Sequence, residues 1–579
     1  MTDVKQLITE HLDIWLTAET SRKSGRGRSS GSNDTIYGVK KLRQLIMDLA
    51  VQGKLVSMDL DDSGVDKFIN EIHEHKTLIA NQNKKVKIVT PKKINHKDLP
   101  FSIPSHWSWA RFGDITINRD AERVPLSTTV RETKKGQYDY YGASGVIDHV
   151  DDYLFDKTLL LIGEDGANLL SRTTPIAFFA TGKYWVNNHA HVIDGISENF
   201  LNYIKLFINA IDLSPYVTGT AQPKMNQAKM NDILVALPPP EEQQRIVEKV
   251  DELMQLCDQL EQQQTLSSDA HATLVDTLLK ALTESNNADE FQDNWQRIVA
   301  NFDVLFTTEH SIEQLKQTVL QLAVMGKLVK QDPSDEPASE LLKKIADEKA
   351  KLIKDGMLKK RSKKYSLPIL DLDFSSNWSL VNLDQIIWNL DAGWSPACHP
   401  YPAKEDKWGV LKTTFVQCNY FIKDENKELP EELDPRIEAE LKSGDILVTR
   451  AGPYNRVGVA CYVDKIRPKL MISDKLIRIS YSQHNLYGAF IALAINLGIS
   501  RDYLKDNQSG MAESQVNISQ EKLREAPFLL PPLNEQKRIV EKVNQLFSII
   551  EQLQVLQSKL QKTKLHLADA LVANAVEGV

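Results

Sequence analysis

The chain has 579 residues, of which 42% are hydrophobic and 26% charged, and its formal net charge is −8 at pH 7. One hydrophobic core rarely grows beyond about 250–300 residues, so this length predicts at least two globular domains. No run of about 18 apolar residues is present, and the N-terminal segment carries acids and no signal-peptide core, so we expect a cytoplasmic protein with no membrane association. The four cysteines show no C-x-x-C spacing, which suits a reducing compartment and argues against a zinc site.

Four sequence segments of the first half of the chain recur about 270–290 residues later, which predicts two copies of one unit. The copies run from about residue 5 to 283 and from about 296 to 579. Ser21–Thr35 is extra in the first copy, and its Gly/Ser/Arg composition predicts a flexible linker. The matching segments come in the same order in both copies: Leu12–Glu19 with Phe302–Glu309, Leu49–Val56 with Leu322–Val329, Trp107 with Trp378, and Leu237–Leu253 with Leu530–Leu546.

Between the tryptophan and the following proline pair, the two copies diverge almost completely. Short β-rich runs bounded by Gly and Pro predict strands, such as TLLLIG and PIAFFA in the first copy and DILVTR and VGVACYV in the second. Helices are expected over Glu198–Ile211 and Tyr487–Leu497. Each copy is therefore predicted to carry its own compact α+β domain on a shared helical frame.

A long helix is predicted after each proline pair, Pro238-Pro239 and Pro531-Pro532, because acidic residues follow in the first turn. Apolar residues at spacings of three and four then predict a coiled-coil seam. About 40 residues with a rise of about 1.5 Å each make a rod of roughly 60 Å. The predicted seam residues are Ile246, Val250, Leu253, Cys257, Leu260, Leu274 and Leu278 in one helix, and Ile539, Val543, Leu546, Ile550, Leu553, Leu560 and Leu567 in the other.

The element P-P-x-x-E-Q-x-R-I-V follows both divergent domains, and the element L-A-V-x-G-K-L-V is followed in the second copy by Asp332–Lys354. These motifs resemble the specificity subunits of Type I restriction–modification systems, in the subclass with an N-terminal copy of the frame. The resemblance covers essentially the whole chain. It implies an α+β fold with two globular α/β target-recognition domains, separated by a pair of long antiparallel coiled-coil helices in a pseudo-two-fold internal repeat.

The resemblance also implies a division of the chain into five segments and a set of partners. In this family each recognition domain binds one half of an asymmetric, interrupted sequence in double-stranded DNA, and the helices set the gap. Two methyltransferase subunits and two motor/nuclease subunits join the frame and carry out adenine methylation or restriction, so S-adenosylmethionine, ATP and Mg²⁺ are expected on those partners and no cofactor on this chain. The implied segments are helical frame 1–97 with its linker at 21–35, recognition domain 98–237, central helical frame 238–374, recognition domain 375–530, and C-terminal helix 531–579.

Sequence motifs for catalysis are missing from the chain itself. Neither proline pair is followed by the Tyr or Phe of a DNA amino-methyltransferase, and no G-x-x-x-x-G-K-[ST] loop occurs. Asp434, Glu440 and Lys442 loosely resemble a metal-dependent nuclease set, but this string looks helical, so a solvated helix is the preferred interpretation. We therefore expect no catalytic residue. A coiled-coil adaptor without a DNA role would explain the helices but not the two unlike domains.

Two loops that follow β runs, Gly163–Arg172 and Arg450–Gly458, are candidate DNA readers, although ordinary surface turns are the alternative. Glycine permits close backbone approach, and Asn and Arg can bond adenine and guanine respectively. A metal site at His189 and His191 is a poor interpretation, because two histidines at positions i and i+2 are a weak signal for metal binding. The candidates are Asp165, Asn168, Arg172, Arg450, Tyr454, Asn455 and Arg456 in these loops, and Tyr141, Ser144, Asn187, Asn188, His189, Gln222, Lys224 and Gln515 elsewhere.

Two basic runs precede the recognition domains and are candidates for phosphate contacts. A solvated linker is an equally good interpretation of such a run. Because the whole chain is acidic, we expect docked partners to supply much of the non-specific grip on DNA. The candidates are Lys84, Lys85, Lys92 and Lys93 in the first run, and Lys360, Arg361 and Lys363 in the second.

Overall fold

The computed structural model describes residues 4–18, 36–59, 61–88, 93–219, 222–285, 288–361, 363–367 and 374–577. The predicted linker at 21–35 and the candidate Lys92 lie outside these ranges. The chain divides into two compact units, Met1–Asp269 with Ser558–Val579, and Ala270–Gln557. Each unit therefore combines most of one copy with the tail of the other copy's long helix. In the described ranges no helix is long and apolar enough to cross a membrane.

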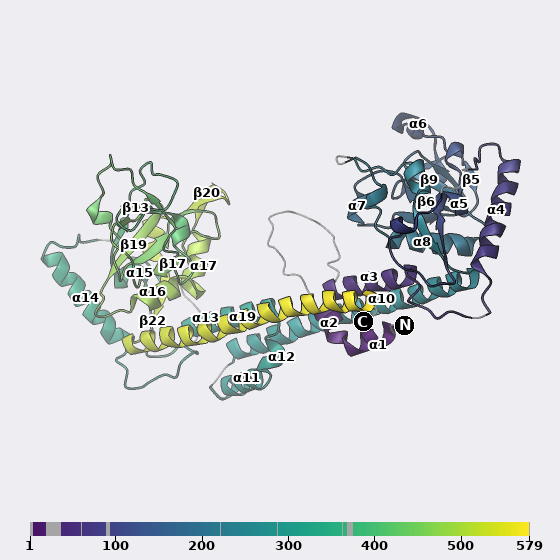
Figure 1. Cartoon of the computed structure of the whole chain (residues 1–579). Coiled ribbons are helices and arrows are strands. Elements are labelled where there is room, and N and C mark those ends of the chain that lie inside the picture. Colours follow the sequence, from purple (N-terminus) through teal and green to yellow (C-terminus); the bar gives the residue numbers. More distant parts are fainter. Residues whose placement is uncertain are drawn as a thin grey trace. The chain divides into compact units, whose positions relative to one another are not determined.

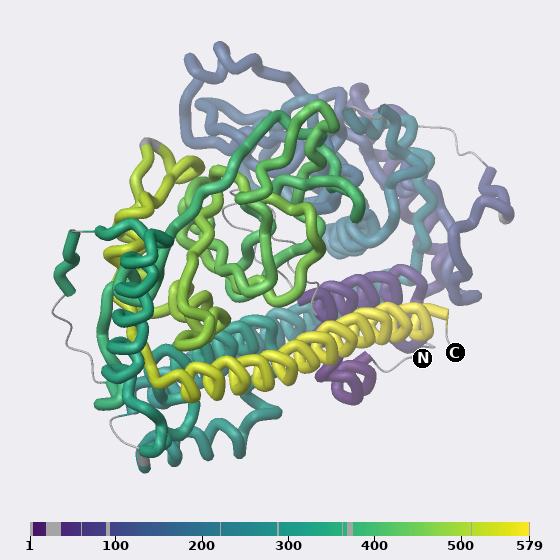
Figure 2. Tube along the Cα trace, turned by 90° about the vertical axis from the view of Figure 1, so that its left-hand side faces the viewer, coloured from purple at the N-terminus to yellow at the C-terminus, as the bar shows by residue number. Residues whose placement is uncertain are grey.

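The frame of the first unit consists of helices that share one apolar core. In the described ranges, helices α1 (Val4–Glu10), α2 (Leu12–Thr17), α3 (Tyr37–Val51) and α4 (Val65–Gln82) precede the recognition domain, and α10 (Pro240–Thr283) follows it. Apolar residues of α3 recur every three or four positions, so one face of this helix is buried. That face packs in one core with the start of α10 and the end of α19 (Leu533–Glu577). Figures 1 and 2 both show α3 beside the C-terminal end of α19, and Lys41 of α3 pairs with Asp569 at 2.9 Å.

The first recognition domain opens and closes on one antiparallel strand pair, β1 (Ser108–Arg111) with β10 (Leu234–Leu237). Its central sheet has the order β2-β9-β6-β7, and β6 and β9 are buried along their whole length because both faces of these strands are covered. Helix α8 (Glu198–Ala210) packs on this sheet and is capped by Ser197. The other strands are β2 (Ile117–Asn118), β6 (Leu159–Gly163), β7 (Ala177–Ala180) and β9 (Ala190–Asp194) of this sheet, and β3 (Lys135–Gly142), β4 (Gly145–Val150), β5 (Phe155–Asp156) and β8 (Lys183–Val186) of a second sheet.

The second recognition domain repeats this plan around different peripheral strands. β11 (Ser379–Asn382) pairs with β22 (Pro527–Leu530), and the central sheet has the order β12-β19-β15-β17, with α16 (Gly488–Ile495) packed on it. The predicted α+β class and internal repeat are confirmed, as are the predicted strands and helices of both domains. The remaining strands are β12 (Ile387–Ala392), β15 (Ile446–Thr449), β17 (Ala460–Tyr462) and β19 (Leu476–Tyr481) of this sheet, β13 (Gly409–Leu411), β14 (Asn426–Glu428) and β18 (Leu470–Met471) of another, and β16 (Ala451–Gly452), β20 (Ser509–Ala512) and β21 (Gln515–Asn517) of a third.

The string around Asp434, Glu440 and Lys442 is not a helix, and that part of the sequence-based interpretation is wrong. Only a single 3₁₀ turn forms there, over Ile437–Ala439. Glu440 accepts a hydrogen bond from the backbone N–H of Lys469 at 2.8 Å, which ties the loop to the start of β18. The glutamate therefore fixes a loop and is not part of a carboxylate pair.

The E-Q-x-R motif makes the same contacts at the start of both long helices. Its glutamine side chain donates to the carbonyl of the first proline of the pair, at 2.9 Å in both copies. Its arginine binds both oxygens of an aspartate far away in the sequence, and such two-pronged pairs fix geometry well. The pairs are Gln243 with Pro238 and Arg245 with Asp62, and Gln536 with Pro531 and Arg538 with Asp335.

In the first copy the glutamate of the motif joins the long helix directly to the entry of the recognition domain. In the second copy it does so through Gln331, which accepts a hydrogen bond from Ser375 at 3.1 Å. Glu242, 1% exposed, accepts hydrogen bonds from the ring nitrogens of Trp107 at 3.1 Å and His106 at 2.8 Å. Glu535, also 1% exposed, accepts one from Gln331 at 2.5 Å, and burial raises the pKa of its carboxyl. The motif is therefore a structural joint between frame and domain.

The G-K-L element fixes the opposite ends of the long helices. Lys327 donates to the carbonyls of Thr283 at 3.0 Å and Ser285 at 2.9 Å at the end of α10, and Lys54 donates to the carbonyl of Val576 at the end of α19. A cation suits the carbonyl end of a helix because unpaired carbonyls and the helix dipole favour positive charge there. Each long helix is thus fastened at its start by its own copy and at its end by the other copy.

The buried faces of the long helices depart from the predicted seam in their second halves. Leu274, Leu560 and Leu567 are about half exposed, and the buried residues are instead Val275 and Ala568. Cys257 and Val275 are 18 residues apart, as are Ile550 and Ala568, which equals five turns of about 3.6 residues. The heptad prediction failed there because these helices keep the period of a straight helix.

A lysine, buried in the first copy and half-buried in the second, ties each recognition domain to the frame helix before it. Lys349 of α14 (Ala338–Lys354) donates to the carbonyls of Asp384 at 2.6 Å and Ile387 at 2.8 Å, and burial lowers its pKa. In the first copy Lys76 of α4 donates to the carbonyls of Gly113 and Asp114 in the same way.

Replacing Lys349 with Met should lower the free energy of unfolding by about 1–3 kcal/mol, because two buried carbonyls lose their donor. Urea titration followed by tryptophan fluorescence would measure the loss. Lys351→Met is the matched control, since Lys351 lies exposed on the same helix and its loss should cost no more than about 0.5 kcal/mol. Equal losses in both variants would contradict the assigned role.

Candidate nucleic-acid interface

Four segments of the first recognition domain meet at one edge of its central sheet. Backbone hydrogen bonds join Glu164 to the carbonyl of His189 at 2.8 Å and Gly166 to that of Pro223 at 3.0 Å. Asn187 donates to the carbonyl of Tyr141 at 3.1 Å, which adds the β3–β4 hairpin. We call this group the first loop cluster; it comprises residues 141–145, 163–172, 187–191 and 222–225. All ten candidates that the sequence placed in this domain lie in it.

The side chains of three candidates in the first loop cluster form hydrogen bonds that hold the loops in place. Asn187, 4% exposed, accepts a hydrogen bond from the backbone N–H of His189. The side-chain amide of Asn168 donates to the carbonyl of Thr174 and accepts from the backbone N–H of Thr174. Arg172 adopts the left-handed conformation, with φ of 51°, and donates to the carbonyls of Ile208 and Ile211 at the end of α8. Burial lowers the pKa of the Arg172 guanidinium. These contacts favour structural roles for all three.

The exposed rim of the first loop cluster carries a mixed set of polar groups. Ser144, Asn188, His189, Gln222 and Lys224 are exposed, and Tyr141 and Asp165 are half-buried. The Lys224 ammonium lies 3.2 Å from the Glu164 carboxylate, so much of its charge is compensated. The rim therefore offers hydrogen-bond donors and acceptors rather than a field of positive charge.

A buried ion cluster supports this rim from beneath. His191, 1% exposed, faces Asp120 at 2.6 Å with Nδ1 and the carbonyl of Met225 at 2.9 Å with Nε2. Both ring nitrogens thus meet oxygen atoms, which hold the ring in place. Burial alone would raise the pKa of Asp120, but the hydrogen bond from His191 and the charges of His191 and Arg123 lower it overall. His191 has no nitrogen free for a metal.

The second recognition domain builds an equivalent group from different residues. Arg450 donates its backbone N–H to the carbonyl of Lys475 at 2.8 Å, and Tyr454 donates to that of Glu513 at 2.8 Å. We call residues 450–458, 473–475 and 509–517 the second loop cluster. The candidates Arg450, Tyr454, Asn455 and Gln515 are exposed on it. Arg456 is different, because its guanidinium donates to the carbonyls of Thr413 and Val416 and holds a neighbouring loop.

The two clusters occupy the same positions on the two central sheets. Gly163 pairs with Ala190 at the end of β6, and Thr449 pairs with Leu476 at the end of β15. The residues just before β9 and β19, His189 and Lys475, therefore correspond. Lys475 is exposed, and sequence reasoning missed it. An alignment of HAHVID with KLIRIS would have indicated Lys475, because each segment consists of a central strand and the residue directly before it.

In the described part of the basic runs, some cations are exposed to solvent and others form ion pairs. Lys84, Lys85, Lys93 and Lys360 are exposed. Arg361 and Lys363 both pair with Glu521, at 3.0 and 2.8 Å, and so fasten the second run to α18 (Gln520–Glu525) of the recognition domain. Because all three side chains are substantially exposed, a DNA phosphate can compete for the two cations.

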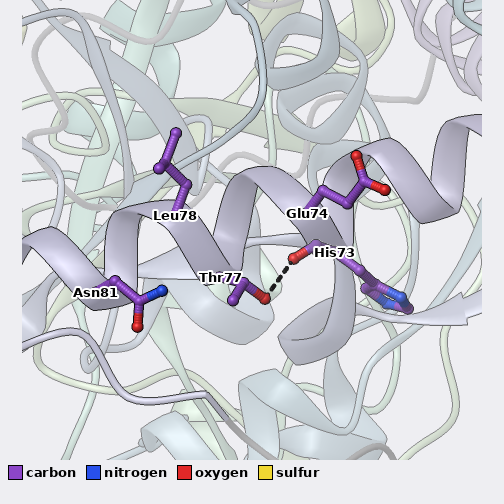
Figure 3. A pocket seen from close by; sticks show the side chains of 5 residues that line it. All are labelled: His73, Glu74, Thr77, Leu78 and Asn81. Atoms are coloured by element: carbon purple, nitrogen blue, oxygen red, sulfur yellow. Dashed lines mark hydrogen bonds between the residues drawn. The ribbon is translucent and has the colours of Figure 1, made fainter.

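A shallow hollow on α4 offers no enclosed site (Figure 3). The five residues that line it, His73, Glu74, Thr77, Leu78 and Asn81, all come from this one helix, and Thr77 bonds the carbonyl of His73 at 2.8 Å. Within the described ranges, no three His, Cys, Asp or Glu side chains are grouped to hold a metal ion. The loop clusters are the better candidates for a functional site.

A duplicated helical frame that carries two unlike domains, each with polar loops gathered at one sheet edge, defines a two-domain recognition protein. The model of the family described as "Type I restriction modification DNA specificity domain" matches residues 104–267 and 397–562. The EcoEI specificity subunit of Escherichia coli, a Type I restriction enzyme subunit, is 42% identical over 99% of this chain and 100% of its own length. The EcoAI specificity subunit of Escherichia coli is 30% identical with the same coverage.

The chain belongs to the family of Type I restriction enzyme specificity subunits. It is therefore a DNA-recognition subunit that acts within a complex, and not itself the catalytic part. Among solved structures, the HsdS subunit from Thermoanaerobacter tengcongensis is 16% identical, with 83% of this chain and 98% of that chain covered and a TM-score of 0.39. The family assignment rests on the family model and the sequence relatives.

Proposed function

We propose that this chain directs a Type I complex to an asymmetric, interrupted DNA sequence, and that each loop cluster binds one half of it. The observation that carries the proposal is the equivalence of the two clusters in backbone position combined with the difference in their side chains. Glu164 and Arg450 make the same 2.8 Å backbone bond to His189 and Lys475, respectively. One scaffold thus presents two unlike polar surfaces, as recognition of two unlike half-sites requires.

The exposed groups of the clusters suit base contacts of different kinds. Asn and Gln side chains match adenine and Arg matches guanine in the major groove. The first cluster offers Asn188 and Gln222, and the second offers Arg450 and Gln515. The exposed cations of the basic runs are suited to phosphate contacts, which position a protein on DNA without specifying sequence.

The assembly that we propose contains two methyltransferase and two motor/nuclease subunits on the duplicated frame. The duplication of the frame, in which the E-Q-x-R joint and the G-K-L end each occur twice, supports two copies of each partner. S-adenosylmethionine, ATP and Mg²⁺ would bind those partners. The four cysteines are free thiols in the structure, which suits the reducing cytoplasm where we place the complex.

The purified chain alone is expected neither to methylate nor to cleave DNA, because the groups that would do so belong to its partners. Incubation of plasmid DNA with labelled S-adenosylmethionine, and separately with ATP and Mg²⁺, measures both activities. Adding the co-expressed methyltransferase subunits should restore methylation. Methyl transfer by the lone chain would overturn the assignment.

Gel-shift experiments separate the main proposal from its alternatives. A specificity subunit should bind DNA weakly alone and sequence-specifically once the methyltransferase subunits have docked, because the chain itself carries a net charge of −8. A self-contained enzyme would modify or cut DNA by itself, and a coiled-coil adaptor would leave the affinity of the partners for DNA unchanged. Either of those results would contradict the proposal.

A further inference from the structure

His189 lies at the exposed rim of the first loop cluster and contacts a carboxylate through one of its two ring nitrogens. Its Nδ1 lies 2.8 Å from Oδ2 and 3.1 Å from Oδ1 of Asp165. The histidine side chain is 51% exposed and the aspartate 29% exposed. Within the described part of the chain, Nε2 has no hydrogen-bond partner, in contrast to His191, both of whose ring nitrogens are bonded.

The backbone around this pair is fixed on both sides. The N–H of His189 donates to the side chain of Asn187 at 2.7 Å, and its carbonyl accepts from Glu164 at 2.8 Å. Asp165 in turn forms a β-bridge with Lys224. The residue is thus held at its backbone and at Nδ1, and its side chain is half exposed; such support is what precise recognition needs.

The carboxylate of Asp165 also determines whether Nε2 of His189 can accept a hydrogen bond. A carboxylate only accepts hydrogen bonds, so Nδ1 keeps its proton, and in the neutral ring Nε2 is then an acceptor. A DNA phosphate oxygen is an acceptor as well, and the carboxylate of Asp165 beside the ring disfavours an anion at this place. In the major groove the donors are the exocyclic amino groups of adenine and cytosine.

We propose that His189, oriented by Asp165, determines the identity of one base pair in the first half-site by accepting a hydrogen bond from the exocyclic amino group of an adenine or a cytosine. Asp165 is the positioning residue that fixes the ring and its tautomer. This inference rests on the proposed function, since it assigns the first loop cluster to a DNA half-site.

The first test compares the sequences methylated by complexes containing the wild-type chain, His189→Ala and Asp165→Ala, each with the methyltransferase subunits. His189→Ala should relax one position of the first half-site about five- to tenfold and keep every other position. Asp165→Ala should relax the same position by a smaller factor. His149→Ala is the matched control, because His149 is another exposed histidine of this domain, 3.3 Å from Asp139, and its loss should leave the sequence unchanged.

The second test removes the amino group from the DNA instead of the acceptor from the protein. In this duplex the base at the relaxed position lacks its exocyclic amino group: unsubstituted purine replaces adenine, or 2-pyrimidinone replaces cytosine. Such a duplex should bind the wild-type complex about five- to tenfold more weakly. The same duplex should bind the His189→Ala complex as tightly as the natural one does. Because the remaining positions stay recognised, misfolding of the variant is excluded by the same data.

Three results would overturn the inference. The His189→Ala complex could keep full stringency at every position, or it could lose affinity uniformly for all sequences with an altered salt dependence, as a phosphate contact would. The amine-free duplex could also bind the wild-type complex unchanged. Failure of the proposed function itself would be recognised separately, because the wild-type complex would then mark no interrupted sequence at all.

Discussion

Replacing residues 98–237 with the recognition domain of another Type I specificity subunit will change one half of the DNA target and leave the other half unchanged. The domain begins and ends on one strand pair, with Ser108 opposite Leu237, so its entry and exit lie side by side and one graft can replace it. The second loop cluster is built from residues 450–517 alone and remains untouched. Sequencing of methylated adenines in DNA exposed to the hybrid complex would measure both halves at once.

The reciprocal exchange of residues 375–530 is the control for this experiment, since β11 and β22 pair in the same way, with Ser379 opposite Leu530. It should change only the other half. An exchange in one domain that altered both halves of the target would show that the clusters do not act independently.

Insertion of four residues after Gln263 will lengthen the gap between the half-sites by one to two base pairs. α10 is continuous there, and its ends are fastened by the pair of Arg245 with Asp62 and by Lys327 at Thr283, so added length cannot be absorbed by slipping. Four residues add about 6 Å of rise, against about 3.4 Å for a base pair. The complex should keep both half-sites and methylate them at the longer spacing.

The matched control inserts the same four residues after Gly356, outside the long helices. This glycine is exposed, has φ of 73°, and no atom lies within 4 Å of the Cβ that another residue would have, so the loop can accept the change. The gap should then stay at its wild-type length. A complex that remained active with an unchanged gap after insertion at Gln263 would contradict the idea that the helix acts as a ruler.

The architecture could be predicted from the sequence because its signals are local and occur twice. The proline pairs marked the start of both long helices, and β-rich runs between glycines marked the central strands. The partners of the E-Q-x-R motif could not be predicted, because Asp62 and Asp335 lie 183 and 203 residues away from the arginines that they bind. These ion pairs form only in the folded frame, so the sequence alone does not indicate which residues pair.

The helix seam shows the limit of a heptad pattern. Leu560 and Leu567 continue the spacing of the first turns, yet both are about half exposed. The end of α19 packs beside α3, and small side chains, Ala568 and Ala575, face that contact. Leucine spacing alone could not reveal that the second half of the helix has a different partner.

The candidate site was predicted as separate loops and is found as two clusters. The segments that sequence reasoning named in the first domain, where Gly, Asn and charged residues follow strand signals, lie together in the first loop cluster. Sequence reasoning could not separate the exposed Asn188 from the buried Asn187, nor foresee that Arg172 and Arg456 are occupied by backbone carbonyls. Those distinctions depend on tertiary contacts.

The central claim is that one chain recognises two half-sites held at a fixed distance. Single-molecule sequencing of methylated adenines, in genomic DNA exposed to the complex of this chain with its methyltransferase subunits, tests it most directly. The expected result is one asymmetric sequence in two parts, with a gap of constant length and variable bases. A continuous methylated sequence, or two half-sites methylated at variable spacing, would contradict the account.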